Sequence, residues 1–127
     1  MADKKDVILS GAQYRLMQIL WALNEGTAAD VLEAWHGRRK PAHTTVGTML
    51  SRLEKRGILD SVRRGRERVF RPLVAESEVK QSMVTQLVGT LFAGDPQGLF
   101  AHLVKDTEVA REDLEAVRRL LDEELKR

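Results

Sequence analysis

Hydroxyl and basic side chains share one segment of this chain with an apolar stripe. Between residues 43 and 56 the apolar positions recur at the spacing of a half-buried helix, at Val46, Met49, Leu50 and Leu53. The other faces of that helix carry Thr44, Thr45, Gly47, Thr48, Ser51, Arg52 and Lys55. Small side chains let a helix enter the major groove of DNA, roughly 12 Å wide, where hydroxyls and arginine hydrogen-bond to base edges or phosphates. The segment therefore predicts a DNA recognition helix, against the ordinary alternative of a half-buried surface helix.

Four arginines lie within six residues a little further along the chain. Residues 58–63 and 68–71 are short strand-like runs, and Gly65 between them supplies a hairpin turn. Guanidinium groups this close repel one another unless a partner supplies negative charge, as a DNA backbone or a narrow minor groove does. A run of charges is usually only a solvated face. Beside a recognition helix, however, we expect the hairpin tip to contact phosphates through Arg63, Arg64, Arg66 and Arg68.

Two further helices are expected before the recognition helix. Their start signals are a hydroxyl residue followed three positions later by a residue that can bond back to it, Ser10 with Gln13 and Thr27 with Asp30. Apolar residues at helical spacing follow each signal, which predicts helices over about 11–24 and 28–36. The turn after the second helix contains three cations that we expect to contact the DNA backbone, Arg38, Arg39 and Lys40.

The order of these elements predicts the fold class. Three helices followed by a short basic hairpin form a winged helix-turn-helix, so we expect a mainly α protein in which residues 1–74 are a winged-helix DNA-binding domain. Residues 1–74 carry 14 Lys and Arg against 8 Asp and Glu, whereas residues 75–127 carry 7 against 11. This asymmetry indicates a basic binding module joined to a solvated acidic module.

Helical periodicity continues through residues 75–127. Helices are expected over about 76–92, from Asp95-Pro96 to about 104, and over about 110–126. Their apolar stripes exceed what short helices can cover internally, which predicts a C-terminal helical dimerisation domain and a homodimer. The residues expected in the dimer contact are Val79, Met83, Leu87, Val88, Leu91, Leu99, Phe100, Leu103, Leu114, Val117 and Leu121.

Composition excludes several classes of function. The chain has no cysteine, which rules out disulfides, thiolate metal sites and a cysteine nucleophile. Its histidines, His36, His43 and His102, are widely spaced and stand beside no Gly-rich phosphate loop or Ser/His/Asp set, so we expect no enzyme, no cofactor and no metal. No stretch approaches the roughly 20 apolar residues that span a bilayer. We therefore expect a cytoplasmic protein without membrane insertion.

In three of its segments the sequence resembles the penicillinase and methicillin-resistance repressor family of the BlaI/MecI type. The resemblance rests on residues 16–21 (LMQILW), 44–59 (TTVGTMLSRLEKRGIL) and 92–95 (FAGD), and covers nearly the whole chain. It implies a repressor of resistance or stress genes that binds dyad operators in double-stranded DNA as a dimer. It maps the DNA contacts to Thr44, Thr45, Thr48, Arg52, Arg64 and Arg66.

The resemblance also implies a mode of regulation. In the family a sensor-linked protease relieves repression by cutting the C-terminal region, and the corresponding cleavage region is Ala101, His102 and Leu103. His102-Leu103 replaces the Asn-Phe bond of family members. Gly47 stands where a larger residue is often found, so the resemblance does not predict the operator sequence. The copper-responsive branch carries a cysteine-rich metal motif that this chain lacks.

Two other functions are compatible with the sequence. A winged helix can be a protein-interaction module that never touches DNA, or a repressor can respond to a small molecule bound beside the DNA-binding domain, although no residue here marks such a pocket. Salt dependence distinguishes a DNA-binding protein from the first alternative. Affinity for duplex DNA falls by about 0.9 log units per log unit of salt for each phosphate contact.

Overall fold

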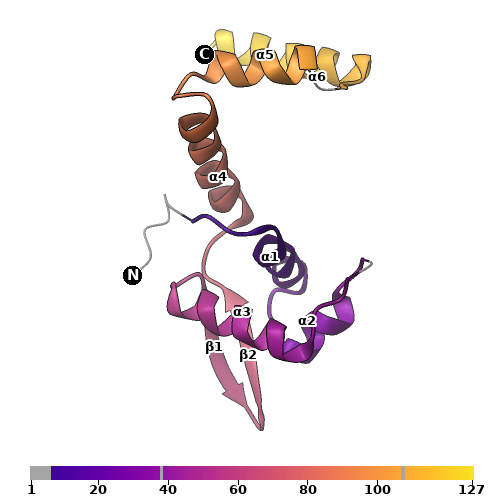
Figure 1. The fold of residues 1–127 in the computed structure, drawn as a ribbon, viewed down its shortest axis with the longest axis vertical. Coiled ribbons are helices and arrows are strands. Elements are labelled where there is room, and N and C mark those ends of the chain that lie inside the picture. The colour runs from indigo at the N-terminus through magenta and orange to yellow at the C-terminus, as the bar shows by residue number, and fades with distance from the viewer. Residues whose placement is uncertain (1–6, 38, 107) are drawn as a thin grey trace. The chain divides into compact units, whose positions relative to one another are not determined.

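A computed structural model of the chain describes residues 7–37, 39–106 and 108–127 (Figure 1). Its elements are α1 (Gly11–Leu23), α2 (Ala28–Ala34), α3 (His43–Lys55), β1 (Leu59–Arg64), β2 (Glu67–Pro72), α4 (Glu76–Leu91), α5 (Pro96–Asp106) and α6 (Arg111–Leu125). The predicted class, three helices and a hairpin followed by further helices, is confirmed. The chain forms two compact units, Met1–Thr85 and Gln86–Arg127, and α4 contributes to both. The division into domains after residue 74 stays a prediction.

Reciprocal side-chain caps start α1 and α2, as the sequence predicts. The Ser10 hydroxyl accepts the Gln13 N–H at 3.1 Å, and the Gln13 side-chain oxygen accepts the Ser10 N–H at 2.9 Å. Thr27 and Asp30 repeat the pair at 3.1 and 2.9 Å. Each box satisfies N–H groups that the first helical turn leaves without a partner, and a cap is typically worth about 1 kcal/mol. Both helix starts are therefore determined locally.

The last turn of α3 closes on a glycine. Gly57 has a φ of 77°, and its N–H donates to the carbonyl of Glu54 at 3.0 Å. The next N–H, of Ile58, donates to the carbonyl of Leu53 at 3.0 Å, and both of these side chains are buried. This is a Schellman motif with its apolar contact. At the other end of α3, Ala42 provides no side-chain cap.

The wing is joined to the helices by a strand pairing that the sequence did not reveal. β1 and β2 pair antiparallel, and Gly65 in their turn has a φ of 66°, as the hairpin prediction requires. In addition Gly26, between α1 and α2, exchanges two backbone hydrogen bonds of 2.9 and 2.8 Å with Phe70. A Cβ at Gly26 would lie 3.3 Å from the Asp30 Cβ, which favours glycine there. This bridge ties β2 to the start of α2.

One hydrophobic core holds the first unit together. The predicted buried stripe of α3 is confirmed, since Val46, Leu50 and Leu53 have 0% exposure and Met49 packs half-buried beside them. The buried residues of the core come from every element of the winged helix and are Val7, Leu9, Leu16, Met17, Leu20, Val31, Trp35, Val46, Leu50, Leu53, Ile58, Leu59, Phe70, Val74 and Val79. The core therefore fixes one face of α3 and leaves the opposite face free.

The first turns of α4 belong to this core. Val79 is fully buried in it, and Met83 packs against it half-buried. We expected both side chains in the dimer contact, and the structure corrects this for Val79, which no second copy can reach. The physical reason is that the segment before α4 is anchored to α1, because the Trp21 indole N–H donates to the carbonyl of Val74 at 2.9 Å. This anchor brings the first turns of α4 against the core.

The helices α5 and α6 present their apolar side chains to solvent. None of their described residues is buried. The Asp95 carboxylate accepts the Gln97 N–H at 3.0 Å, which confirms the predicted helix start, and α5 continues to Asp106, beyond its expected end. No described helix combines the length and the apolar character that crossing a bilayer requires. The exposed members of the predicted dimer set are Leu87, Leu91, Phe100, Leu103, Leu114, Val117 and Leu121, and the half-buried ones besides Met83 are Val88 and Leu99.

Val79→Ala should lower the free energy of unfolding by about 2 kcal/mol, because buried methyl groups are lost and a cavity is left. Val84→Ala is the matched control, since Val84 lies on the same helix and is 51% exposed. Its effect should stay within about 0.5 kcal/mol. Urea denaturation measures both values. Equal effects would contradict the inclusion of α4 in the winged-helix core.

Candidate nucleic-acid interface

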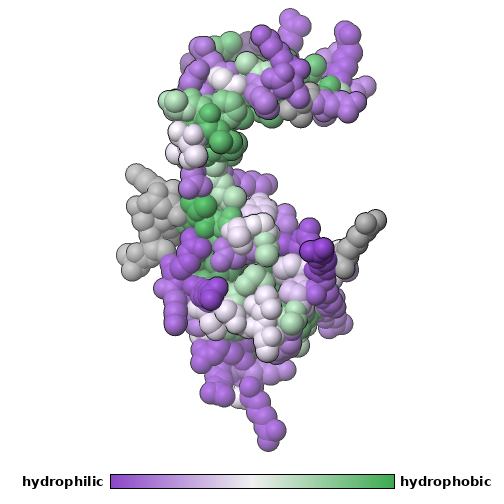
Figure 2. Space-filling view, viewed as in Figure 1, coloured by the Kyte–Doolittle hydropathy of each residue, from purple (hydrophilic) through white to green (hydrophobic). Residues whose placement is uncertain are grey.

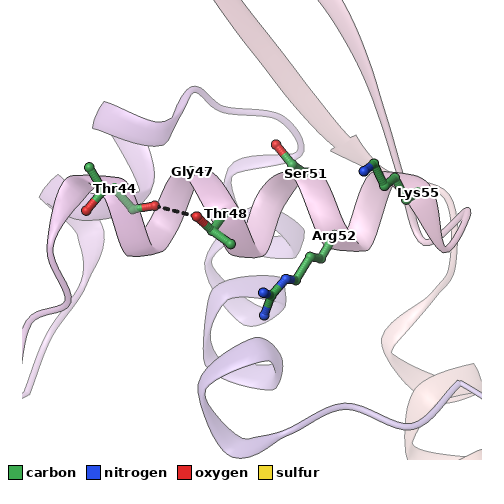
Figure 3. A pocket seen from close by; sticks show the side chains of 6 residues that line it. All are labelled: Thr44, Gly47, Thr48, Ser51, Arg52 and Lys55. Carbon is green, nitrogen blue, oxygen red and sulfur yellow. Dashed lines mark hydrogen bonds between the residues drawn. The ribbon is translucent and has the colours of Figure 1, made fainter.

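The face of α3 opposite its buried stripe is open and hollowed. Thr44, Gly47, Thr48, Ser51, Arg52 and Lys55 line one concavity along it (Figure 3). Helical periodicity alone brings them together, because residues three and four apart share a face. All except Gly47 were predicted as DNA contacts from the sequence. The remaining predicted residue of this helix, Thr45, is exposed but does not line the concavity.

Two features of α3 determine what the middle of the concavity offers to a ligand. The Thr48 hydroxyl donates to the carbonyl of Thr44 at 3.0 Å, so its proton is used inside the helix while its oxygen can still accept. A Cβ at Gly47 would meet nothing within 4 Å. Glycine inside a helix costs roughly 0.5–1 kcal/mol relative to alanine, and no contact in the described part of the chain requires it here. The middle of the face is therefore free for a close approach.

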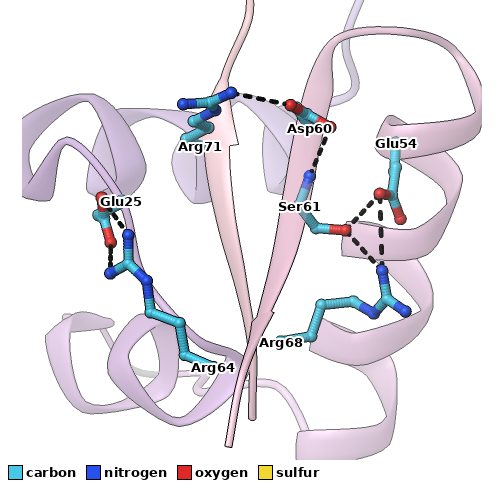
Figure 4. A network of polar contacts seen from close by, with 7 residues as sticks. All are labelled: Glu25, Glu54, Asp60, Ser61, Arg64, Arg68 and Arg71. Atoms are coloured by element: carbon cyan, nitrogen blue, oxygen red, sulfur yellow. Dashed lines mark hydrogen bonds and ion pairs between the residues drawn. The ribbon is translucent and has the colours of Figure 1, made fainter.

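The wing surface is hydrophilic, as is much of the surface around it (Figure 2). Carboxylates of the same chain lie beside two of the four wing arginines and offset their charge (Figure 4). Arg64 forms an ion pair with Glu25, which lies 39 residues earlier in the chain. The Arg68 guanidinium donates to the Ser61 hydroxyl at 2.8 Å and lies 3.9 Å from the Glu54 carboxylate, to which Ser61 also donates. For these two arginines the negative charge that we expected from DNA is already supplied within the chain.

The other two wing arginines have their guanidinium groups available. Both Arg63 and Arg66 are exposed, and neither forms a hydrogen bond or ion pair with another described residue. In the hairpin register Arg63 lies opposite Arg68, and like charges directly opposite are destabilising. The contact of Arg68 with Glu54 offsets part of that repulsion. Arg63 and Arg66 are thus the wing side chains most ready to bind an anion.

A further ion pair lies nearer the base of the wing. An Arg71 nitrogen is 3.1 Å from a carboxylate oxygen of Asp60, and the two residues are directly opposite in the register. The hydrogen bond from Arg71, followed by that from the backbone N–H of Ser61, lowers the pKa of Asp60. The carboxylate is therefore charged at neutral pH. Cross-strand register was the signal that could have revealed this pair, whereas no sequence signal links Glu25 or Glu54 to the wing.

The approach to α3 adds positive charge and free donors. Arg39 and Lys40, both predicted contacts, are exposed in the turn before the helix. The third predicted cation of this turn, Arg38, lies outside the described residues. Because Ala42 gives no side-chain cap, the first N–H groups of α3 lack an acceptor from that residue. Free N–H groups at the start of a helix attract phosphate.

These features together define a class of protein. A three-helix unit carries a two-stranded wing, and its exposed helix presents hydroxyls and cations beside two arginines that have no partner among the described residues. Among the residues that the structure describes, no group of histidine and acidic side chains could hold a metal ion. Hydrogen-bond donors along a helix and cations on a wing suit nucleic acid, which offers base edges to the helix and phosphates to the cations. The fold and the site define a winged-helix DNA-binding protein.

Comparison with known proteins then assigns the family. Residues 9–123 match the family model described as penicillinase repressor, and the chain belongs to this family. It is 32% identical over 117 residues to the transcriptional regulator BlaI of Mycobacterium tuberculosis (strain CDC 1551 / Oshkosh), covering 91% of this chain and 83% of that protein. It is 23% identical over 120 residues to the methicillin resistance regulatory protein MecI of Mammaliicoccus sciuri, covering 94% and 98%. The chain is a DNA-binding transcriptional repressor and not an enzyme.

Solved structures show the same fold. The DNA-binding domain of the repressor BlaI superposes with a TM-score of 0.51 at 27% identity, covering 61% of this chain and 93% of that domain. A mutant of MarR from E. coli superposes with a TM-score of 0.52 at 16% identity, covering 92% and 78%. The second likeness concerns the fold alone. The first shows that this winged helix is shared with the DNA-binding domain of a family member.

Glu25→Gln should raise the affinity for random-sequence duplex DNA, because it releases Arg64 to contact phosphate. One additional phosphate contact steepens the slope of log affinity against log salt by about 0.9. Glu33→Gln is the matched control, since it removes the same charge from the same surface depression and Glu33 has no arginine partner among the described residues. Fluorescence anisotropy at several salt concentrations gives both slopes. If the two variants share one slope, Glu25 does not withhold Arg64.

Gly47→Ala should have opposite effects on folding and on DNA binding. The free energy of unfolding should rise by roughly 0.5–1 kcal/mol, because alanine is the better helix former and its Cβ meets open space. Affinity for the operator should fall by about tenfold, equivalent to 1.4 kcal/mol, because the methyl group obstructs close approach. Urea denaturation and anisotropy titration measure the two effects. Tighter or unchanged operator binding would show that DNA does not approach α3 at Gly47.

Proposed function

We propose that the protein acts as a homodimer that represses genes by binding a dyad operator in double-stranded DNA, and that proteolysis of its C-terminal part ends repression. The observation that carries the DNA contact is the open face of α3 beside a wing in which Arg63 and Arg66 have no partner among the residues that the structure describes. Bacterial relatives are named penicillinase repressor and methicillin resistance regulatory protein. By that kinship the controlled genes are resistance or stress genes, and the protein acts in the cytoplasm.

In the proposed complex α3 lies in the major groove and reads the bases. Arg52 is the side chain on this face best suited to discrimination, because arginine bonds to guanine through two hydrogen bonds worth roughly 1–3 kcal/mol. Hydroxyls are less selective, since they pair with several bases or with phosphate. The other residues assigned to this contact are Thr44, Thr45, Thr48, Ser51 and Lys55.

The wing and the turn before α3 hold the phosphate backbone. Arg63 and Arg66 do so directly, because no carboxylate competes for them among the described residues. Arg64 and Arg68 must exchange a protein carboxylate for a phosphate, so their net contribution is smaller. The turn contributes Arg38, Arg39 and Lys40.

The proposed dimer is formed by the C-terminal helices. Phe100 on α5 is 55% exposed, and Val117 and Leu121 on α6 are 47% and 51% exposed. Helices without a buried face need a partner to cover their apolar stripe, and a second copy provides an identical one. Leu114, Val117, Leu121 and Leu125 recur at intervals of three and four residues, the spacing at which helices pair side by side.

The proposed cleavage lies within α5. Ala101, His102 and Leu103 are all exposed, and no described residue of α5 is buried. A protease needs an extended segment, and a helix with few buried contacts opens at a low free-energy cost. A cut there separates α6 from the winged helix. Each half of the dimer would then keep only one half-site of contacts.

Arg52→Ala should reduce the preference for operator over random duplex, whereas Arg66→Ala should weaken binding to both duplexes alike. Base contacts specify a sequence, and phosphate contacts only position the protein. Anisotropy titrations with an operator selected from a random-sequence library, and with the library itself, measure both ratios. Arg66→Ala should also reduce the salt slope by about 0.9. If both variants bind as the parent protein does, the assigned DNA face is wrong.

Truncation after Ala101 should abolish dimerisation and lower dyad affinity, because it removes the apolar stripe of α6. Light scattering at micromolar concentration gives the oligomeric state, and anisotropy gives the affinities for the dyad and for a single half-site. Half-site affinity should stay unchanged, since residues 7–85 remain. A truncated chain that dimerises and binds the dyad like the full chain would refute this mechanism.

A further inference from the structure

Three side chains connect α1 to the start of α4. The Tyr14 hydroxyl donates to the Glu76 carboxylate at 2.6 Å, and the Trp21 indole N–H donates to the carbonyl of Val74 at 2.9 Å. The two rings also contact each other edge to face, with centroids 5.8 Å apart and planes at 69°. Tyr14 and Trp21 are two helical turns apart and therefore share a face of α1. Together they hold both the segment before α4 and its first turn.

The Tyr14 hydroxyl remains a hydrogen-bond donor to Glu76 at physiological pH. The bond to Glu76 and burial raise the pKa of Tyr14 to about 12, so its hydroxyl stays protonated and keeps donating throughout the physiological range. Glu76 is also 3.9 Å from Lys80, one turn along α4. The core beneath is tight, since Val74 and Val79 are 4% and 0% exposed. Packing of the buried side chains is enough to hold α4 near α1. The two hydrogen bonds add a preferred direction for the first turn of α4.

None of these residues lines the DNA face of α3. Their position matters for another reason, which rests on the dimer proposed above. The chain runs from the winged helix through α4 into the segment that we assign to dimerisation. A dimer reads two half-sites whose separation is about one helical turn of DNA, some 34–36 Å, or a multiple of it. If the C-terminal helices form the proposed dimer, the direction of the first turns of α4 affects the separation of the two recognition helices.

We propose that Tyr14, Trp21 and Glu76 are positioning residues for operator binding: they set the direction in which α4 leaves the winged helix, and thereby the half-site spacing that the dimer accepts. The hydrogen bonds are directional, whereas the hydrophobic effect that buries Val79 is not. Loss of the polar contact therefore loosens the spacing requirement and leaves the recognition of each half-site intact.

Tyr14→Phe tests this most cleanly, because it removes the hydroxyl and keeps the ring. The probes derive from the operator selected from the random-sequence library, whose spacing is taken as the natural spacing. They are a duplex with one half-site, and duplexes with two half-sites at the natural spacing or with one or two base pairs added or removed. We expect dyad affinity at the natural spacing to fall by about fivefold, the low end of coupling between sites. The loss at altered spacings should be smaller, and half-site affinity should be unchanged.

Glu76 supplies a matched pair of variants. Glu76→Gln keeps an oxygen that accepts the Tyr14 hydroxyl and should retain the parent profile, whereas Glu76→Ala should reproduce Tyr14→Phe. Equal losses on half-site and dyad duplexes would show a merely structural role, and an unaltered spacing profile in Tyr14→Phe would also overturn the proposal. If the parent protein binds two half-sites no more tightly than one, the dimer itself is wrong and this inference falls with it.

Discussion

Burial of one stripe of α3 governs the other features of the winged helix. An α-helix turns once every 3.6 residues, so placing Val46, Leu50 and Leu53 in the core determines the side chains that face outward. The neighbouring elements serve that placement. The Schellman turn at Gly57 ends the helix, and the bridge between Gly26 and Phe70 ties the wing to the helices. The outward face of α3 is therefore held by a rigid support.

If the wing contacts DNA as proposed, its internal ion pairs balance attraction for DNA against selectivity. Four free arginines would raise the affinity for every duplex, since phosphates are the same in all sequences. Pairing Arg64 with Glu25 and placing Arg68 beside Glu54 reduces that sequence-independent part. A repressor must find its operator among a large excess of competing sites, so the ratio of affinities matters more than either one. In the proposed complex, the carboxylates of Glu25 and Glu54 therefore improve discrimination between the operator and other duplexes.

The two units differ in how they are stabilised. The first has a closed core, whereas α5 and α6 have no buried residue among those described. A segment of this kind gains stability from whatever covers it, by mass action. In the proposed dimer, two half-sites bound together also benefit from a high effective concentration of the second. A small change in the association of the C-terminal helices of that dimer therefore alters occupancy of the operator strongly.

Elements that depend on near neighbours could be predicted from the amino-acid sequence. Both capping boxes, the hairpin, the end of α3 and its outward face follow from caps, turn glycines and periodicity, whose partners lie within a few residues. Periodicity places Val79 on the apolar stripe of its helix but does not reveal what covers that stripe, and only the structure places Val79 in the winged-helix core. The pairs Arg64–Glu25 and Tyr14–Glu76 join residues far apart in the chain. Such contacts arise only when whole elements pack against one another, so no local pattern in the chain reveals them.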